Sequence, residues 1–465
     1  MLGSMVALAT LGDPGRALLW VAPVADDSEL ATEDPLALDY IAQQVGLMLL
    51  PALTTRSSRA QAFAMVLYGL ALADRAIAKY GEPATDESRR VLFERWERFW
   101  ALATMEYRQG DLPRGDGDAM RGVRGAKSAW RPGDGALPLD FPLISRQQEL
   151  GNLGAYLSPL RRAGLVIDGT LRPSPAALDI IDAFWDEPGE NKQRGRYDDY
   201  AMQALDRRRT KLDRTNAGLT LRAVGKLSRL SSLTARGRAP QQRRLFDALF
   251  ERARDPSTFA VTKMVEAATA AGILATPDLL DGAIAGRLGP IPGDLRELLV
   301  TARRFGTAMD VLLRAFDRVY SVVHGAGWTA QAGQVATTAL DAATLAAVRA
   351  ACADILDAPR VSALRGLPMH GGACMRLAEE LVRADGATAL DALLRYHDTV
   401  QRERRRGQGW IRAEGDRLVL LVTAYTARPD AVRFPTFKLD TVRALLVDTG
   451  RLSPDTAPIA EDGDS

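Results

Sequence analysis

The sequence contains little of what membrane proteins and disulfide-rich secreted proteins depend on. It has two cysteines, Cys352 and Cys374, among 465 residues. Two cysteines cannot form the framework of bridges that stabilises small secreted domains, so we expect a reducing, cytoplasmic environment. No apolar run reaches the ~20 residues of a membrane span, and the first residues lack the basic start and apolar centre of a signal peptide. We therefore expect no contact with a membrane.

Recognisable catalytic motifs are also missing. The three histidines, His324, His370 and His397, form no HExxH pair, and "HGGAC" lacks the lysine of a phosphate-binding loop. We expect no catalytic centre, no metal and no cofactor, with an enzyme such as a nuclease built from scattered residues as an alternative. Cys374 is expected to be buried beside a turn. The adjacent His397 and Asp398 are expected to form a pair on a helix surface.

The residues that are abundant predict helices. Aromatic residues make up 6% of the chain, whereas apolar residues make up 47% and charged residues 25%. Strong helix formers dominate, so we expect a mainly α, multi-domain protein. The periodicity and the Gly- and Pro-rich breaks predict these segments: an N-terminal extension 1–30, a helical domain 31–110, a loop or linker 111–140, a winged-helix-like domain 141–190, a basic helical segment 191–255, a helical domain 256–405, a C-terminal hairpin and helix 406–453, and a disordered acidic tail 454–465.

The stretch "LPALTTRSSRAQAF" joins the first two predicted helices. The first is expected to open at Asp34 and Pro35, and the second at a capping box from Ser58 to Gln61. Arg56 and Arg59 then lie at the positive end of a helix dipole, where something negative should compensate them. They form a possible anion site. We favour instead ion pairs with the internal acids Glu33, Asp34 or Asp39.

A helix, a short hairpin and a second helix follow between residues 143 and 185. "LSPLRRAGLV" reads as a helix that ends before a turn at Asp168-Gly169, and Ser174-Pro175 starts the next helix. The pattern resembles the recognition helix and wing of a winged-helix domain, although Pro159 should kink its helix. Such domains bind DNA or serve as protein-interaction modules. The expected phosphate or base contacts are Arg146, Asn152, Tyr156, Arg161, Arg162 and Arg172.

The charge is unevenly distributed. Residues 192–254 hold 17 basic and 6 acidic residues, a net charge of +11, whereas the whole chain is +2. Such asymmetry indicates a polyanion or an acidic partner, or a helical arm against the chain's own acidic surface. For DNA, the expected contacts are Arg207, Arg208, Arg209 and Lys211, on one exposed face and without a saturated set of internal ion pairs.

The C-terminal region starts with a second basic cluster, at Arg402 and 404–406, followed by Trp410. Trp410 is expected to lie in the core rather than to stack on a base, and the role of the arginines stays open. A hairpin is predicted to turn at Gly415-Asp416. The last helix is expected to be capped by Asp440 and to end at Gly450.

Three stretches resemble a group of uncharacterised bacterial proteins found in anti-phage defence loci. Pro51, Thr54, Thr55, Arg56 and Arg59 match an "LPGxTT"-like turn and the helix start after it, with Ala52 in place of the turn glycine. "GNLGAYLSPLRRAGL" resembles a second shared block, and "GWIRAEGDRLVL" with "FKLDTVRALL" a third. The resemblance implies a defence role beside other defence-system proteins and no known catalysis.

We therefore expect a non-catalytic component of a multi-protein defence system that binds double-stranded DNA through the winged-helix-like and basic segments. An interaction scaffold without DNA contact is the alternative.

Overall fold

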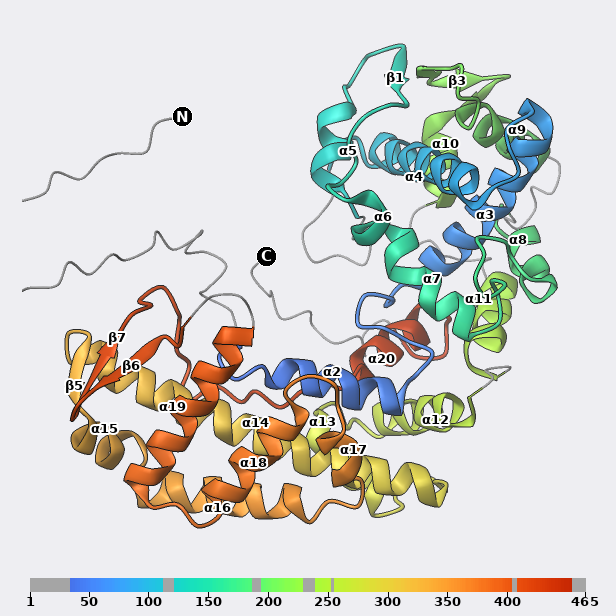
Figure 1. Cartoon of the computed structure of the whole chain (residues 1–465). Coiled ribbons are helices and arrows are strands. Elements are labelled where there is room, and N and C mark those ends of the chain that lie inside the picture. Colours follow the sequence, from blue (N-terminus) through green and yellow to red (C-terminus); the bar gives the residue numbers. More distant parts are fainter. Residues whose placement is uncertain are drawn as a thin grey trace, which may run out of the picture.

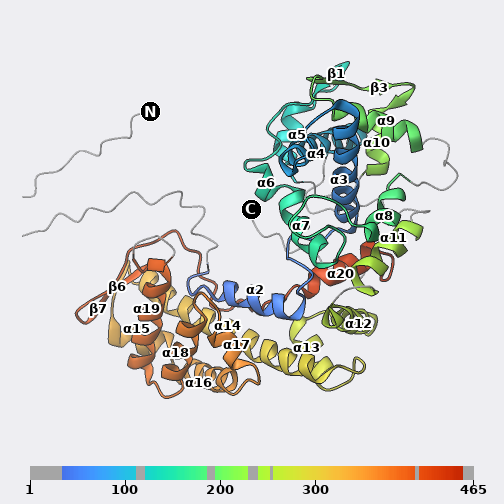
Figure 2. The same cartoon turned by 45° about the vertical axis from the view of Figure 1, so that its right-hand side comes forward.

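Two helical lobes make up the protein, and helices α2 (Leu38–Leu49) and α20 (Leu439–Asp448) lie where the lobes meet (Figure 1, Figure 2). The computed structural model describes residues 34–111, 121–185, 194–228, 239–251, 255–403 and 408–453. Its sheets have two or three strands each. The expected mainly α fold with a small C-terminal hairpin is confirmed. The expected extension 1–30 and tail 454–465 lie outside the described residues.

The first lobe runs from α3 to residue 251 and is built around α4. Its elements are α3 (Ala60–Tyr80), α4 (Asp86–Arg108), α5 (Val123–Ala129), β1 (Ala136–Pro138), α6 (Gln147–Leu150), α7 (Asn152–Arg162), the 3-10 turn Pro175–Ala177, α8 (Leu178–Asp182), α9 (Arg194–Ala204), β2 (Lys211–Asp213), β3 (Thr215–Asn216), β4 (Leu219–Thr220), α10 (Leu221–Ser228), α11 (Ala239–Phe246) and the π-helical turn Asp247–Glu251.

Helix α4 is central because its aromatic side chains fill the lobe. Phe93, Trp96, Phe99 and Trp100 are fully buried, as the helical spacing predicts, and α3, α5, α9 and α10 pack around them. Helix α3 has the length and composition of a membrane span, but most of that stretch is buried inside this lobe.

The second lobe is built around the long helix α14. Its elements are α12 (Pro256–Ala270), α13 (Thr276–Ile284), α14 (Gly293–Gly325), β5 (Thr329–Gln331), α15 (Ala332–Ala339), α16 (Ala342–Leu356), α17 (Val361–Arg365), α18 (Gly371–Leu381), α19 (Gly386–Glu403), β6 (Ile411–Glu414) and β7 (Arg417–Leu420). The predicted hairpin turns at Gly415, and β5 adds a third antiparallel strand beside β7 that was not predicted.

One face of α14 fixes the segment that returns from β7 to α20. Asp317 accepts hydrogen bonds from the Tyr425 hydroxyl at 2.6 Å and the Arg428 amide at 2.8 Å, and Asp310 accepts the Arg433 amide at 2.7 Å. One turn earlier, Gly306 leaves room for the ring of Phe434. These contacts hold the segment between β7 and α20 along α14, and this segment leads to the junction of the lobes.

The starts of three helices differ from the predictions by one to three residues. Helix α2 begins at Leu38, although the carboxylate of Asp34 does accept the Asp39 amide at 2.7 Å across a left-handed Ala37. Helix α3 begins at Ala60, after Arg59 and not at Ser58. Helix α20 begins after Lys438, so Asp440 is not its cap, but it ends before a left-handed Gly450 as predicted.

The lobes do not follow the expected segment boundaries. Helix α2 packs on α14 and α12 of the second lobe, so residues 31–110 are divided between the two lobes. The expected linker 111–140 contains α5 and β1, and β1 pairs with β2 of the basic segment. That segment also contains β3 and β4, and its helix α10 packs on α4. It is therefore part of the first lobe and not a separate arm.

Candidate nucleic-acid interface

The α2–α3 loop, residues 50–59, lies between α20 and α7 at the junction of the lobes. Its hydroxyls close a turn: the Ser57 hydroxyl donates to the Thr54 carbonyl at 2.8 Å and accepts the Thr54 amide at 2.9 Å. On the α7 side, the Arg59 amide donates to the Tyr156 hydroxyl at 3.3 Å, and Arg162 donates to the Pro51 carbonyl. The hydroxyl-rich loop is thus a structured turn.

The two arginines of this loop have different environments. Arg59 forms an ion pair with Asp448 of α20 at 3.1 Å. The expected partners Asp34 and Asp39 do not pair with Arg59, and Glu33 lies outside the described residues; the internal acid that does pair comes from α20, near the other end of the sequence. The carboxylate of Asp448 also accepts the Ala60 amide at 3.0 Å, so it fills the place of an anion at the start of α3. The Arg56 side chain is exposed and forms no ion pair within the described residues.

Helix α5 presents basic side chains because small residues form its inner face. A Cβ atom on Gly125 would lie 2.2 Å from the Leu143 carbonyl oxygen and 2.4 Å from that of Pro142, so only glycine permits this close approach. Ala126 is buried on the same side. The opposite side therefore carries Arg124 and Lys127, both exposed.

Arg121 connects α5 to the α2–α3 loop. Its guanidinium donates to the carbonyls of Leu150 and Arg56, each at 3.2 Å. Arg162 binds the same loop five residues earlier, at Pro51. We define the α5 cationic face by five residues that form no ion pair within the described part of the chain: Arg56, Arg121, Arg124, Lys127 and Arg162.

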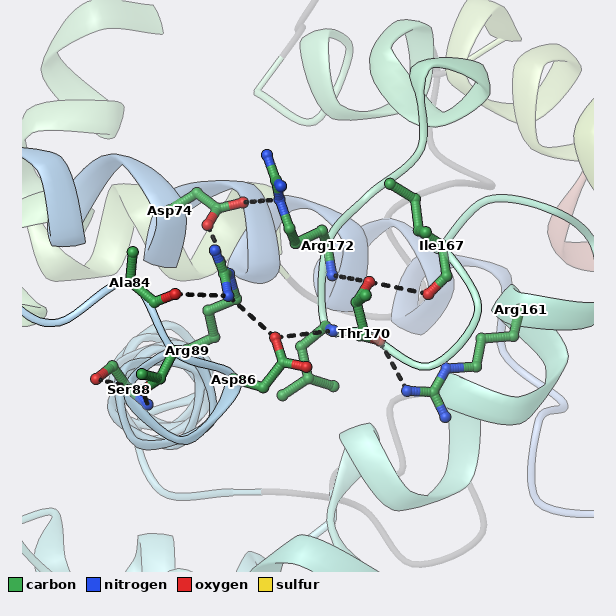
Figure 3. A network of polar contacts seen from close by, with 11 residues as sticks. Asp74, Ala84, Asp86, Ser88, Arg89, Arg161, Ile167, Thr170 and Arg172 are labelled. Atoms are coloured by element: carbon green, nitrogen blue, oxygen red, sulfur yellow. Dashed lines mark hydrogen bonds and ion pairs between the residues drawn. The ribbon is translucent and has the colours of Figure 1, made fainter.

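The predicted helix–hairpin–helix unit is present, but its hairpin is attached to the rest of the lobe. Val166 and Pro173 form a single β-bridge, and α7 continues past Pro159 to Arg162. Figure 3 shows how the turn is attached to α3 and α4: Asp86 accepts the Leu171 amide at 3.3 Å, while Arg89 links Asp86 at 3.0 Å to Asp74 at 2.7 Å. These bonds hold the hairpin to α3 and α4, so it is not an independent wing.

Two of the expected arginines hold this hairpin, Arg161 from α7 and Arg172 from the hairpin itself. Arg161 donates to the Thr170 carbonyl at 2.7 Å, and Arg172 lies 4.0 Å from Asp74 (Figure 3). Arg146 is exposed but pairs with Glu149 at 3.1 Å. Of the arginines expected in this segment, Arg162 is the one that joins the α5 cationic face.

Asn152 and Tyr156 are buried, which corrects their assignment as DNA contacts. The carboxylate of Glu97 on α4 accepts the Asn152 amide at 2.7 Å, the Asn152 side chain at 2.9 Å and the Gln147 side chain at 2.7 Å. Burial raises the pKa of Glu97, and these three donors oppose that rise. Burial also raises the pKa of Tyr156 to about 12. Asn152 and Tyr156 therefore hold α7 through contacts inside the protein.

The basic cluster 207–209 is exposed but largely neutralised within the chain. Arg207 pairs with Glu82 at 3.0 Å, whereas Arg208 and Arg209 pair with Asp206 at 2.9 and 3.9 Å. Each arginine has an internal acidic partner, but Arg208 and Arg209 share the single carboxylate of Asp206, so the three arginines face two acids. Lys211 is exposed on β2. Residues 229–238 and 252–254 of the basic segment, and residues 404–407 with the arginines whose role was left open, lie outside the described residues.

The residues considered for catalysis have structural contacts. His397 is fully buried, which corrects the expected surface pair: its Nε2 accepts the Trp410 amide at 2.9 Å, so Nδ1 carries the proton and donates to the Pro35 carbonyl at 2.7 Å. Trp410 is buried, as predicted. Cys374 is also buried, which raises its pKa to about 12. Within the described residues, no three His, Cys, Asp or Glu side chains are grouped to hold a metal ion.

The sequence did contain a signal for the α5 cationic face. Residues 121–133 hold four basic residues and no acidic one, and Arg121, Arg124 and Lys127 follow at helical intervals of three. The glycines and prolines around them are typical of a loop, which is why the segment was interpreted as a linker. Comparison with family models, curated proteins and solved structures finds no match for this chain.

Proposed function

We propose that the protein binds double-stranded DNA through the α5 cationic face, as a non-catalytic component of a bacterial anti-phage defence system. The observation that carries the DNA contact is a set of five cations, at α5, in the α2–α3 loop and at the end of α7, that form no ion pair within the described residues. Elsewhere on the lobe, arginines such as Arg207 and Arg208 already pair with internal acids. Guanidinium and ammonium groups that are not already engaged by carboxylates suit the phosphates of a duplex.

The binding is electrostatic and weakly dependent on DNA sequence. Each phosphate contact releases counterions, so five contacts predict a slope of about −4 to −5 in the logarithm of affinity against the logarithm of salt concentration. Arg121 and Arg162 use part of their N–H groups on backbone carbonyls, and each guanidinium has further donors for a phosphate. The defence role rests on the family resemblance of the α2–α3 loop and of the C-terminal block.

The DNA contact is tested by fluorescence anisotropy with a labelled duplex at several salt concentrations. The variant Arg56→Ala/Arg124→Ala/Lys127→Ala should lose about 3 units of slope, because each removed phosphate contact contributes about 0.9. The matched control Arg207→Ala/Arg208→Ala/Arg209→Ala removes the same number of charges from the internally paired cluster and should change the slope by less than one unit.

The possible outcomes separate the candidate functions. A slope that changes only in the control variant would move the interface to residues 207–209. The absence of binding at low salt would reject the DNA contact and leave an interaction scaffold with an acidic protein partner. The defence role is tested separately, by comparing phage plating on cells that carry the complete locus with cells whose copy of this gene is deleted. Equal plating efficiencies would reject it.

A further inference from the structure

Helix α20 contacts the α2–α3 loop at both of its ends. At its start, the Lys438 ammonium donates to the carbonyls of Leu53 at 2.7 Å and Leu50 at 3.3 Å. At its end, Asp448 binds Arg59 at 3.1 Å and the Ala60 amide at 3.0 Å. Ten residues of helix span about 15 Å, so α20 holds the loop from beginning to end.

The loop that α20 holds is a covalent connection between the lobes. Helix α2 before it packs on the second lobe, and helix α3 after it belongs to the first. Helix α20 itself packs on α12 and α3, one from each lobe. Figure 1 shows α20 at the junction of the lobes. Its buried side chains Lys438 and Asp448 bind the connecting loop.

The contacts at both ends of α20 include strained backbone and buried charges, and both favour dissociation of α20 from the α2–α3 loop. Phe437 and Lys438 are consecutive non-glycine residues in the left-handed region, with φ of 50° and 67°. Lys438 is 4% exposed and has carbonyls, not a carboxylate, as its hydrogen-bond acceptors. Burial and the nearby Arg162 lower its pKa to about 7, and burial raises the pKa of Asp448 to about 6. Both ends of α20 thus hold charged groups in surroundings that disfavour the charge.

We propose that α20 is a releasable clasp, formed by the Lys438 and Asp448 contacts, and that DNA binding at the α5 cationic face opens it. The coupling has a physical cause. Arg56 of the face is three residues from Arg59, whose side chain is 26% exposed. A phosphate at Arg56 attracts the Arg59 guanidinium away from Asp448 and repels the Asp448 carboxylate. DNA therefore favours the open clasp. Without DNA the clasp stays closed, and α20 then holds the two lobes in a fixed relation.

The clasp itself does not require DNA, whereas its trigger rests on the proposed function. Hydrogen exchange of the free protein tests the clasp: Asp448→Asn should increase exchange in α20 and in residues 50–60 together, by tenfold or more. Lys438→Met removes the other contact and should give the same pattern if Asp448→Asn does not fold. The clasp is rejected if exchange changes in one of the two segments alone, or in neither.

Affinity tests the trigger, because coupling between two sites is reciprocal. If DNA opens the clasp, Asp448→Asn should bind the labelled duplex at least fivefold more tightly than Asp440→Asn. The control removes the same charge from the same helix, at a side chain that is 39% exposed and pairs with Arg443. Equal affinities of the two variants, with α20 released in the first, would reject the trigger. If neither variant nor the parent binds DNA, the proposed function fails while the exchange result still decides the clasp.

Discussion

The carboxylate of Asp448 and the guanidinium of Arg59 form an ion pair at 3.1 Å although 389 positions separate them in the sequence. Helix α3 has no side-chain cap of its own, and Asp448 supplies one by accepting the Ala60 amide. The first N–H groups of a helix have no partner inside the helix, so a carboxylate at this position stabilises it. The start of α3 therefore depends on the docking of α20.

The first prediction concerns this pair. Arg59→Ala leaves the Asp448 carboxylate buried without its cation and should lower the free energy of unfolding by about 3 kcal/mol, the lower end of the range for a broken buried pair. Arg56→Ala is the matched control: its side chain is exposed and unpaired within the described residues, so the loss should stay within about 0.5 kcal/mol. Urea unfolding measures both, and similar losses in the two variants would contradict the assignment.

The second prediction is a pH dependence at Lys438. Its folded pKa of about 7 lies below the ordinary value of 10.5, because burial and Arg162 disfavour the ammonium. Between these two values the unfolded chain binds more protons than the folded one, so the free energy of unfolding rises with pH above 7, by at most about 1.4 kcal/mol per unit. Lys438→Met should remove this rise. A stability profile between pH 7 and 9 with the same slope in the variant and the parent would refute it.

Asp448 affects the pH dependence of stability in the opposite direction to Lys438, and its effect can be measured at lower pH. Its folded pKa of about 6 lies above the ordinary 3.8, so the folded chain binds more protons between these values. The contribution of Asp448 to stability is therefore fully present below pH 4 and is lost as pH rises through 6. Asp448→Asn should flatten that part of the profile, whereas Lys438→Met should leave it unchanged.

The third prediction concerns the cap that Glu97 supplies to α7. Glu97→Ala removes the acceptor of three buried N–H donors from Asn152 and Gln147. It should cost about 3 kcal/mol in the free energy of unfolding, because unsatisfied buried donors are expensive. Glu149→Ala removes a carboxylate that is 66% exposed and paired with Arg146, and should cost less than about 0.5 kcal/mol. Thermal unfolding with both variants would contradict the role of Glu97 if their midpoints agreed.

The fourth prediction separates the geometry of the cationic face from its charge. Gly125→Ala places a Cβ atom against the Leu143 and Pro142 carbonyl oxygens and must displace α5. Stability should fall by about 1 to 3 kcal/mol, and DNA affinity several-fold, although every basic residue remains. Gly135→Ala meets no atom within 4 Å and should change neither quantity. Unchanged DNA affinity in Gly125→Ala would show that the position of α5 does not matter for binding.

Local signals predicted the helices well and their ends poorly. Spacing alone identified α4 with Phe93 and Trp96 in the core, and Gly415 was sufficient for the hairpin turn. The caps of α3 and α7 could not be found in this way, because Asp448 and Glu97 come from distant helices. A three-residue strand such as β5 has no period of its own and depends on β7 as its partner.

The candidate site was only partly predictable for related reasons. Counting basic residues finds a cluster at 207–209, but their ion pairs with Glu82 and Asp206 appear only when the chain is folded. Asn152 and Tyr156 have the polar groups of a recognition helix, and their burial depends on α4 and the α2–α3 loop. At α5 the charge pattern was visible, while the close packing of Gly125 that exposes it was not.

The distant cap of α3 also constrains how the protein is made. During synthesis, N-terminal segments leave the ribosome first and begin to fold there. Helix α3 can form early, but the carboxylate that completes its start belongs to residue 448, which emerges after the whole second lobe. The nascent first lobe therefore keeps an uncapped α3 and an open loop until the second lobe and α20 have been synthesised. A stop codon or proteolytic cut that removes α20 should therefore destabilise the first lobe as much as the second.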